Sequence, residues 1–211
     1  MINGKNNMVN LLELKHKSCK KYRSDLWGHV LSKGKYDKLG EYLCNEYRRP
    51  SRQRRRSKSY KELMEDQKKV RLFYGGVKMA AYKRYQAEGS VIKGLECRLA
   101  MVAYRLNFTG SIGEAIEYVK RGHFLVNNEV IIHPNWPIKK GDVIQVAPQY
   151  RHKLYKALEK RLKERYYPLP YGKYLEVNYQ IMAGILLNEP VFEEVYLPFP
   201  VSKISLGKHY I

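Results

Sequence analysis

The apolar and polar positions between residues 95 and 146 predict a small α+β module. The apolar side chains of its first part recur at i, i+4, i+7 and i+11, and they are Leu95, Leu99, Val102 and Leu106. This spacing is typical of the buried side of one helix. Arg98 and Arg105 are seven positions apart, so we expect them on the opposite side, and Asn107 ends the helix because asparagine tolerates a left-handed backbone.

A second helix is predicted immediately afterwards. Ser111 and Glu114 have the spacing of a capping box, in which each residue satisfies a free backbone donor of the first turn. Ala115 and Val119 then face inward, and Gly122 occupies the position of a C-terminal cap. Two short amphipathic helices therefore open the module.

Three short strands are predicted to complete it. Residues 124–126 and 130–132 are rich in β-branched and aromatic side chains, and they flank Asn127, Asn128 and Glu129. Because asparagine tolerates positive φ, a tight hairpin is expected there. Gly141 and Asp142 then turn the chain into a further strand over 143–146.

Helical patterns also flank the module. Ser59 and Glu62 form another capping box, and the helix that they open is expected to end at Gly75-Gly76. A second helical stretch covers 77–88, and a basic helix lined by Leu154, Leu158 and Leu162 covers 151–165. The tail from residue 171 is apolar and interrupted by prolines, which predicts irregular strands that pack on the body or on a protein neighbour.

Charge indicates the class of partner. The chain has 211 residues and a formal charge of +20, with a pI near 9.8. Such an excess of cations is tolerated most easily beside a polyanion. Nucleic acid is the first candidate and an anionic membrane surface the second. The longest apolar run, 182–187, is far shorter than the roughly 20 residues of a spanning helix, so we expect no membrane partner.

Residues 1–58 form a basic arm, which ends in the block RRPSRQRRRSK. A like-charge run of this kind is usually a solvated, disordered segment. Aromatic residues interrupt the charges, however, and a purely solvating tail contains few of them. We therefore interpret the arm as one that becomes ordered on RNA. The aromatic residues are Tyr22, Trp27, Tyr36, Tyr42 and Tyr47.

No catalytic or metal-binding pattern is found. Cys19, Cys44 and Cys97 lack the spacing of a zinc site, so we expect free thiols. His123 and His133 have no carboxylate or cysteine at metal-ligand spacing. The sequence therefore predicts neither a cofactor nor a metal, and a protein that is not an enzyme.

These elements resemble the S-four RNA-binding domain, and the chain is similar to the universal uS-four family of small-subunit ribosomal proteins. The residues that carry the resemblance are Glu96, Arg98, Leu99, Val102, Tyr104, Arg105, Phe108, Glu114, Ala115, Val119, Gly122, His123, Val126, Asn127 and the run Gly141 to Ile144. Outside the domain, SYKELMEDQKKVRLFYG and YLEVN are similar to further segments of the family.

The resemblance implies an α+β fold with a helical body and an inserted domain of the alpha-L type, preceded by the extended basic arm. We divide the chain into the arm at 1–58, a helical body at 59–92, the RNA-binding domain at 93–150, and a basic helix with an apolar tail at 151–211. The implied function is a structural constituent of the small ribosomal subunit. Its implied partners are small-subunit rRNA, neighbouring small-subunit proteins and mRNA at the entry pore.

Two departures from the family are noted. Ile112 and Ile116 stand where relatives usually carry arginine, so we expect two phosphate contacts fewer than in those relatives. Some relatives hold zinc with four cysteines in the arm, which offers only two here. The apolar tail and the abundance of Tyr, Lys, Ile and Asn favour a mitochondrial, organelle-encoded ribosomal protein, with the bacterial cytoplasm as the alternative.

The candidate RNA-binding residues come from the arm, the helical body and the domain. They are Arg48, Arg49, Arg52, Arg54, Arg55, Arg56, Lys58, Lys68, Lys69, Arg71, Arg98, Arg105, Lys120, Arg121, His123, Arg151 and Lys153. Two other functions remain open. One is an RNA-modifying enzyme or a tyrosyl-tRNA synthetase that docks through the domain, although the chain lacks a Gly-rich phosphate loop. The other is a stress-response factor that binds ribosomes.

Overall fold

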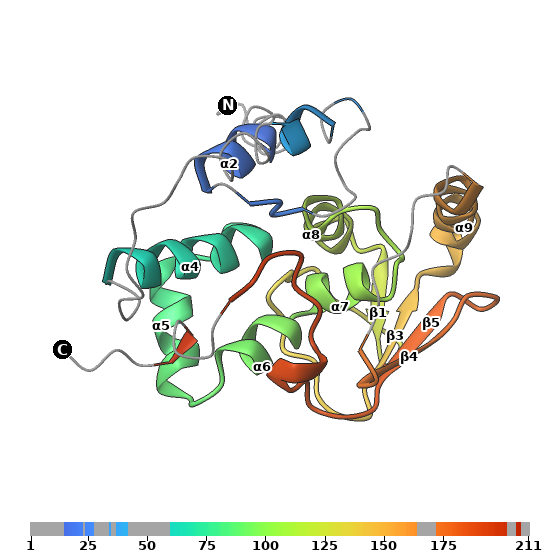
Figure 1. The fold of residues 1–211 in the computed structure, drawn as a ribbon. Coiled ribbons are helices and arrows are strands. Elements are labelled where there is room, and N and C mark those ends of the chain that lie inside the picture. Colours follow the sequence, from blue (N-terminus) through green and yellow to red (C-terminus); the bar gives the residue numbers. More distant parts are fainter. Residues whose placement is uncertain are drawn as a thin grey trace, which may run out of the picture. The chain divides into compact units, whose positions relative to one another are not determined.

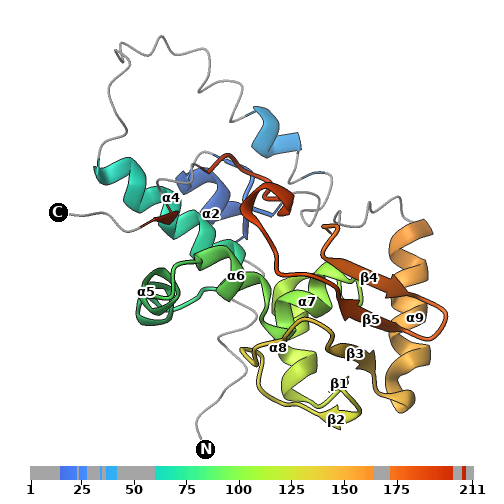
Figure 2. The same cartoon turned by 90° about the horizontal axis from the view of Figure 1, so that it is seen from below.

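In the computed structural model, the described residues are 15–22, 24–27, 34, 37–41, 60–163, 172–201 and 206–207. They divide into two compact units, one formed by 1–78 with 197–211 and one by 79–196. Figures 1 and 2 show the elements of both from two directions. The domain boundaries given above stay a prediction.

The first unit contains helices α2 (Lys15–Tyr22) and α4 (Tyr60–Phe73). The predicted end of α4 is confirmed, since Gly75 and Gly76 both have positive φ, and the amide of Gly76 donates to the carbonyl of Arg71 at 2.9 Å. Phe73 packs edge-on against Tyr74 and against Phe199 from the C-terminal segment. Ser59, the expected cap of α4, lies outside the described residues.

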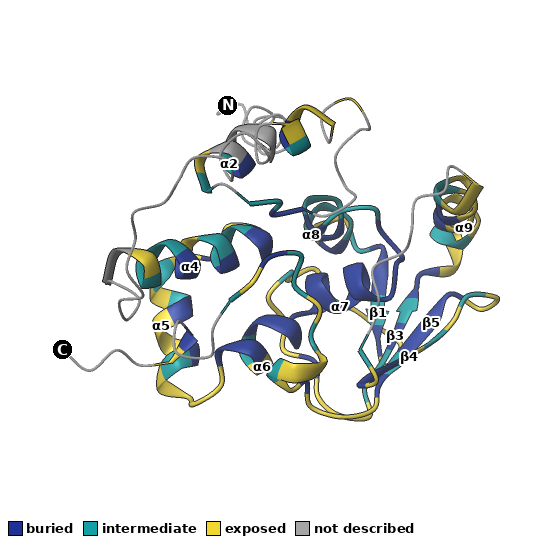
Figure 3. Ribbon diagram, viewed as in Figure 1, coloured by how far each residue is buried: buried dark blue, intermediate teal, exposed yellow. Residues whose placement is uncertain are grey.

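The second unit begins with four helices. They are α5 (Met79–Ala87), α6 (Val91–Glu96), α7 (Leu99–Arg105) and α8 (Ile112–Lys120). The stripe of Leu95, Leu99, Val102 and Leu106 is buried as expected (Figure 3). Asn107 has a φ of 59°, which confirms the predicted left-handed residue after α7.

The single helix predicted over 95–106 is wrong, because the chain breaks between α6 and α7. Arg98 has extended backbone angles and forms a β-bridge with Pro137. The first amides of α7 donate to the loop that contains Pro137, Leu99 N to the carbonyl of Trp136 at 2.9 Å and Ala100 N to that of Pro134 at 3.1 Å. These carbonyls satisfy donors that a helix N-terminus leaves free.

Within the described residues, the sheet has five antiparallel strands in the order β2-β1-β3-β5-β4. The strands are β1 (Phe124–Val126), β2 (Glu129–Val130), β3 (Val143–Val146), β4 (Leu175–Asn178) and β5 (Ala183–Leu186). The predicted hairpin is confirmed, with Asn127 and Asn128 at φ of 50° and 71°. Its loop has two residues, so the strand expected over 130–132 is instead Glu129–Val130.

The C-terminal segment joins this sheet. β5 pairs with β3, so strands from residues 175–186 extend the sheet of the predicted module. Helix α9 (Pro148–Lys163) precedes them and starts earlier than expected, since proline suits the first turn of a helix. Leu154 and Leu158 are buried, whereas Leu162, further along the same side of the helix, is exposed. The α+β class is confirmed.

Candidate nucleic-acid interface

Helix α8 is fixed at both ends by the residues that the sequence indicated. The Ser111 hydroxyl accepts from the Glu114 amide at 3.2 Å, and the Glu114 carboxylate accepts from the Gly110 amide at 2.7 Å. At the other end Gly122 has a φ of 72°, and the His123 amide donates to the Tyr118 carbonyl at 3.0 Å. This end places consecutive cations in the last turn and cap of α8.

An aromatic stack joins the end of α8 to the start of α9. The His123 ring stacks on Tyr150 with centroids 3.7 Å apart, and its distance to the Tyr118 ring is 4.7 Å. The Lys153 ammonium lies 5.9 Å from the Tyr118 ring, within the range of a cation–π contact. The stack therefore brings cations of the two helices to one surface.

We name this surface the α8–α9 basic patch and define it as Lys120, Arg121, Arg151 and Lys153. The first two and Lys153 are exposed. Arg121 forms an ion pair with Glu117, one helical turn earlier. Arg151 is half-buried, and its Nε donates to the Val146 carbonyl at 3.2 Å, which orients its guanidinium. Such cations suit phosphate oxygens, which guanidinium groups can bind in a bidentate manner.

His123 packs inside the aromatic stack. The residue is 5 % exposed, which leaves little surface for the direct contact with RNA, and that contact stays a prediction. Burial lowers the pKa of His123, and the positive charges of Lys153 and Arg121 lower this pKa further. Burial also raises the pKa of the Tyr118 hydroxyl to about 12. His123 is thus neutral at pH 7, and its pKa responds to the positive charges of the patch.

Arg105 lies inside the domain and not on the helix surface where the sequence placed it, whereas its contact with RNA stays a prediction. Its side chain is 1 % exposed and its guanidinium forms two hydrogen bonds with Glu96, Nη2 to Oε1 at 2.6 Å and Nε to Oε2 at 3.0 Å. The Tyr174 hydroxyl donates to Glu96 at 3.0 Å, and burial together with the Glu96 charge raises the pKa of Tyr174. Every residue of α7 is buried, so this helix has no solvent-facing side on which Arg105 could lie.

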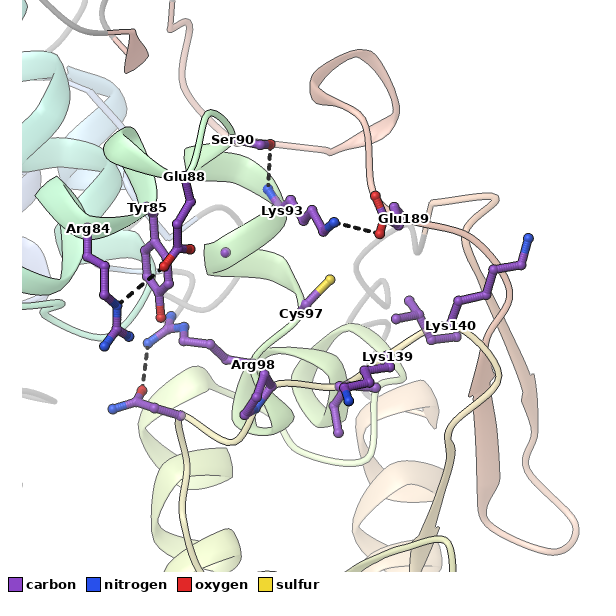
Figure 4. A pocket seen from close by; sticks show the side chains of 15 residues that line it. Arg84, Tyr85, Glu88, Ser90, Lys93, Cys97, Arg98, Lys139, Lys140 and Glu189 are labelled. Atoms are coloured by element: carbon purple, nitrogen blue, oxygen red, sulfur yellow. Dashed lines mark hydrogen bonds and ion pairs between the residues drawn. The ribbon is translucent and has the colours of Figure 1, made fainter.

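Arg98 also departs from its expected place on a helix surface. Its side chain is mostly covered at 6 % exposure, since Nε donates to the Leu95 carbonyl at 3.1 Å and Nη1 to the Asn135 amide oxygen at 3.2 Å. Arg98 lines a cleft instead, with residues of α5, α6 and the loop 134–140 (Figure 4).

The candidates of the first unit have different environments. Lys68 is exposed, Lys69 pairs with Asp66 at 3.4 Å, and the Nε of Arg71 donates to the Val77 carbonyl at 2.7 Å. Arg71 therefore also stabilises the turn after α4. The candidates of the arm lie outside the described residues, and they are Arg48, Arg49, Arg52, Arg54, Arg55, Arg56 and Lys58.

Among the residues with described side chains, no three of His, Cys, Asp and Glu gather as metal ligands would. Cys19 and Cys97 are buried, and burial raises the pKa of each thiol to about 11. None of the helices in the described part of the chain has the length and apolar character needed to cross a bilayer.

Sequence reasoning missed the residues that build the patch and the cleft. Tyr118 and Tyr150 support the patch through His123, and Asn135 orients Arg98. The only signal for Tyr118 and Tyr150 was an aromatic residue beside the cations, and that signal did not identify the stacking partner. The sequence contained no signal for Asn135, because its partner Arg98 is 37 positions away.

Comparisons with known proteins identify the family. The family model of the S4 domain matches residues 97–144. A small ribosomal subunit protein uS4 from Sulfurihydrogenibium is 30 % identical over 166 residues, which cover 74 % of this chain and 79 % of the relative. The chain belongs to the uS4 family. Another uS4 protein, from Caldicellulosiruptor bescii, is 31 % identical over 78 % of this chain and 84 % of its own length.

A mitochondrial member of the uS4 family is also similar. The uS4m protein of Reclinomonas americana is 26 % identical over 208 residues, which cover 93 % of this chain and 82 % of the relative. The S4 match falls on α7, α8 and strands β1 to β3. The α8 half of the basic patch therefore belongs to the S4 domain, and Arg151 and Lys153 follow it on α9.

Proposed function

We propose that this chain is a structural constituent of the small ribosomal subunit that binds small-subunit rRNA and supports assembly of the subunit. The observation that carries the proposal is the α8–α9 basic patch on an S4 domain in a uS4 family member. The net charge of +20 adds to it, because so many cations repel one another unless a polyanion neutralises them. The protein acts by binding and not by catalysis.

Binding follows from neutralisation of phosphates and recognition of RNA shape. Lys120 and Lys153 are exposed ammonium groups, and Arg121 and Arg151 add guanidinium groups beside them. Double-stranded RNA is recognised mostly through its backbone and shape. Each neutralised phosphate releases counterions, so the affinity falls as the salt concentration rises. Lys68, Lys69 and Arg71 of the first unit and the basic arm supply further phosphate contacts in this proposal.

We extend the proposal to the surroundings of the protein. Neighbouring small-subunit proteins and mRNA at the entry pore are the further partners, and the mitochondrial ribosome is the proposed location. The mitochondrial relative, which aligns with 93 % of the chain, and the abundance of Tyr, Lys, Ile and Asn support that location. Bacterial relatives of similar identity keep the bacterial cytoplasm as the alternative.

Co-sedimentation tests this proposal. A structural constituent stays with intact small subunits, in equal numbers, through a high-salt wash, and the organelle fraction that contains it gives its location. Loss of the protein from the subunits in the wash would indicate a transient ribosome-binding factor. Conversion of uridine to pseudouridine, or aminoacylation of tRNA, by the purified chain would indicate an enzyme.

A further inference from the structure

The second unit contains a cleft that is separate from the α8–α9 basic patch. It has a volume of about 650 Å³ and lies among α5, α6, the loop 134–140 and the residues that follow β5. This volume falls within the range of small-molecule sites, which is roughly 300–1,000 Å³. Five cationic and two acidic side chains line it, and they are Arg84, Lys93, Arg98, Lys139, Lys140, Glu88 and Glu189.

One wall of the cleft is an aromatic ring held in a fixed position. The Tyr85 ring packs against Gly94 so closely that a Cβ on Gly94 would lie 2.3 Å from a ring carbon. On α5 the guanidinium carbon of Arg84 lies 5.4 Å from the centre of the same ring. Absence of a side chain at position 94 therefore lets the ring lie across α6. In Figure 4 the Arg98 side chain extends toward this ring.

The floor of the cleft offers hydrogen bonds in a fixed orientation. Arg98 donates from Nη1 to the side-chain oxygen of Asn135. The side-chain nitrogen of Asn135, an exposed residue, therefore points away from Arg98. An exposed amide can bind the edge of an unpaired RNA base by hydrogen bonds. Tyr85 and Arg98 are 8 % and 6 % exposed, so they form a wall of the cleft and not a stacking surface. A double helix keeps its bases stacked inside and cannot place one in a cleft.

Cations at the rim suit the phosphates beside such a base. Lys93 pairs with Glu189 at 2.5 Å across the mouth, and Lys139 is exposed beside it. The lining has a net charge of +3, from five cations and two carboxylates. We propose that the cleft receives one unpaired nucleotide of the bound rRNA, with the edge of its base at the Asn135 amide and its phosphate at Lys139. This inference rests on the proposed function.

Hydroxyl-radical footprinting of the backbone of small-subunit rRNA, with and without the full chain, tests it, because the radicals cleave at paired and unpaired nucleotides alike. The wild-type chain should protect duplex nucleotides and at least one unpaired nucleotide. Asn135→Asp keeps an acceptor for Arg98 but removes the amide donor and adds a negative charge, and Lys139→Gln removes a rim cation. Both should lose the unpaired protection, keep the duplex protections and bind roughly 10-fold more weakly, about the contribution of one hydrogen bond to a charged group.

The matched control is Lys83→Gln, which removes an exposed lysine of α5 outside the lining. It should keep every protection. Protections identical to wild type in both cleft variants would overturn the inference and leave the proposed function intact; the cleft would then suit an acidic protein segment. A wild-type chain that protects no nucleotide would instead contradict the proposed function. Thermal melting checks that each variant is folded.

Discussion

Arg105 donates two hydrogen bonds to Glu96, and the two side chains are 1 % and 0 % exposed. The pair connects α7 to α6 across the break in the chain. Arg105 Nη2 also donates to the carbonyl of Tyr196 at 2.9 Å, and Glu96 accepts from Tyr174. One ion pair thus links four segments of the second unit, which gives these charges a structural role.

Arg105→Ala should destabilise the protein without removing a phosphate contact. The substitution leaves the Glu96 carboxylate buried without its main partner, which typically costs about 3–5 kcal/mol. Urea denaturation measures the change in the free energy of unfolding. RNA affinity, measured where the variant is still folded, should change little. A large loss of RNA affinity with an unchanged free energy of unfolding would indicate that Arg105 contacts RNA.

The exposed pair Arg84–Glu88, at 3.7 Å, provides the control for that experiment. Surface pairs contribute at most about 1 kcal/mol. Glu88→Gln should therefore leave the denaturation midpoint almost unchanged. A loss of stability as large as that of Arg105→Ala would show that burial does not determine how much an ion pair contributes to the stability of this protein.

Two helical glycines should respond to alanine in opposite directions. A Cβ on Gly94 meets the Tyr85 ring at 2.3 Å, so Gly94→Ala must displace the ring, and overpacking typically costs about 1–3 kcal/mol. A Cβ on Gly113, in α8, meets its nearest neighbour at 4.0 Å. Gly113→Ala should stabilise by up to about 1 kcal/mol. Thermal melting distinguishes the two, and equal shifts would contradict the packing described for Tyr85.

Local chemistry was readable from the sequence. The Ser111 cap, the turn at Asn127-Asn128 and the glycine after α8 each depend on a few neighbouring residues, and the structure confirms them. Glu114 accepts from the amide of Gly110 instead of that of Ser111, which a capping box would use. The buried leucine stripe was also predicted correctly, because helical spacing continues across the break before Leu99 closely enough to keep those side chains inside.

Contacts between segments that are distant in the sequence could not be predicted from it. The break before Leu99 depends on carbonyls of Pro134 and Trp136, which lie more than thirty positions away. Glu96, the buried partner of Arg105, also accepts from Tyr174, which lies 78 positions away. Likewise, nothing near residue 175 indicates pairing with the strand at 143–146. Periodicity identified the elements, whereas the two arginines of the candidate site needed the tertiary fold.

Removal of two patch cations should weaken RNA binding and reduce its salt dependence. In the variant Lys120→Gln with Lys153→Gln, two exposed cations are lost from α8 and α9. The slope of log affinity against log salt should become shallower by roughly 1.4–1.8, at 0.7–0.9 for each phosphate. The control Lys83→Gln with Lys173→Gln removes two exposed lysines elsewhere. Equal effects of both variants would show that net charge alone matters.

RNA at the patch should raise the pKa of His123. Lys153 and Arg121 lower this pKa in the free protein, and a phosphate beside them would cancel part of their field. The complex should then take up part of a proton, so binding should strengthen slightly as the pH falls from 7.5 toward 6. NMR titration of the His123 ring gives the pKa directly. Lys153→Gln should raise it without RNA, and an unchanged pKa on RNA binding would place the RNA elsewhere.

The most direct test of the central claim is equilibrium binding of the full chain to small-subunit rRNA, measured against an unrelated structured RNA of the same length across a series of salt concentrations. We expect tighter binding to small-subunit rRNA throughout, with an affinity that falls steeply as salt rises, by a log–log slope of roughly −0.7 to −0.9 for each phosphate neutralised. Equal affinity for the two RNAs, or an affinity indifferent to salt, would contradict the account.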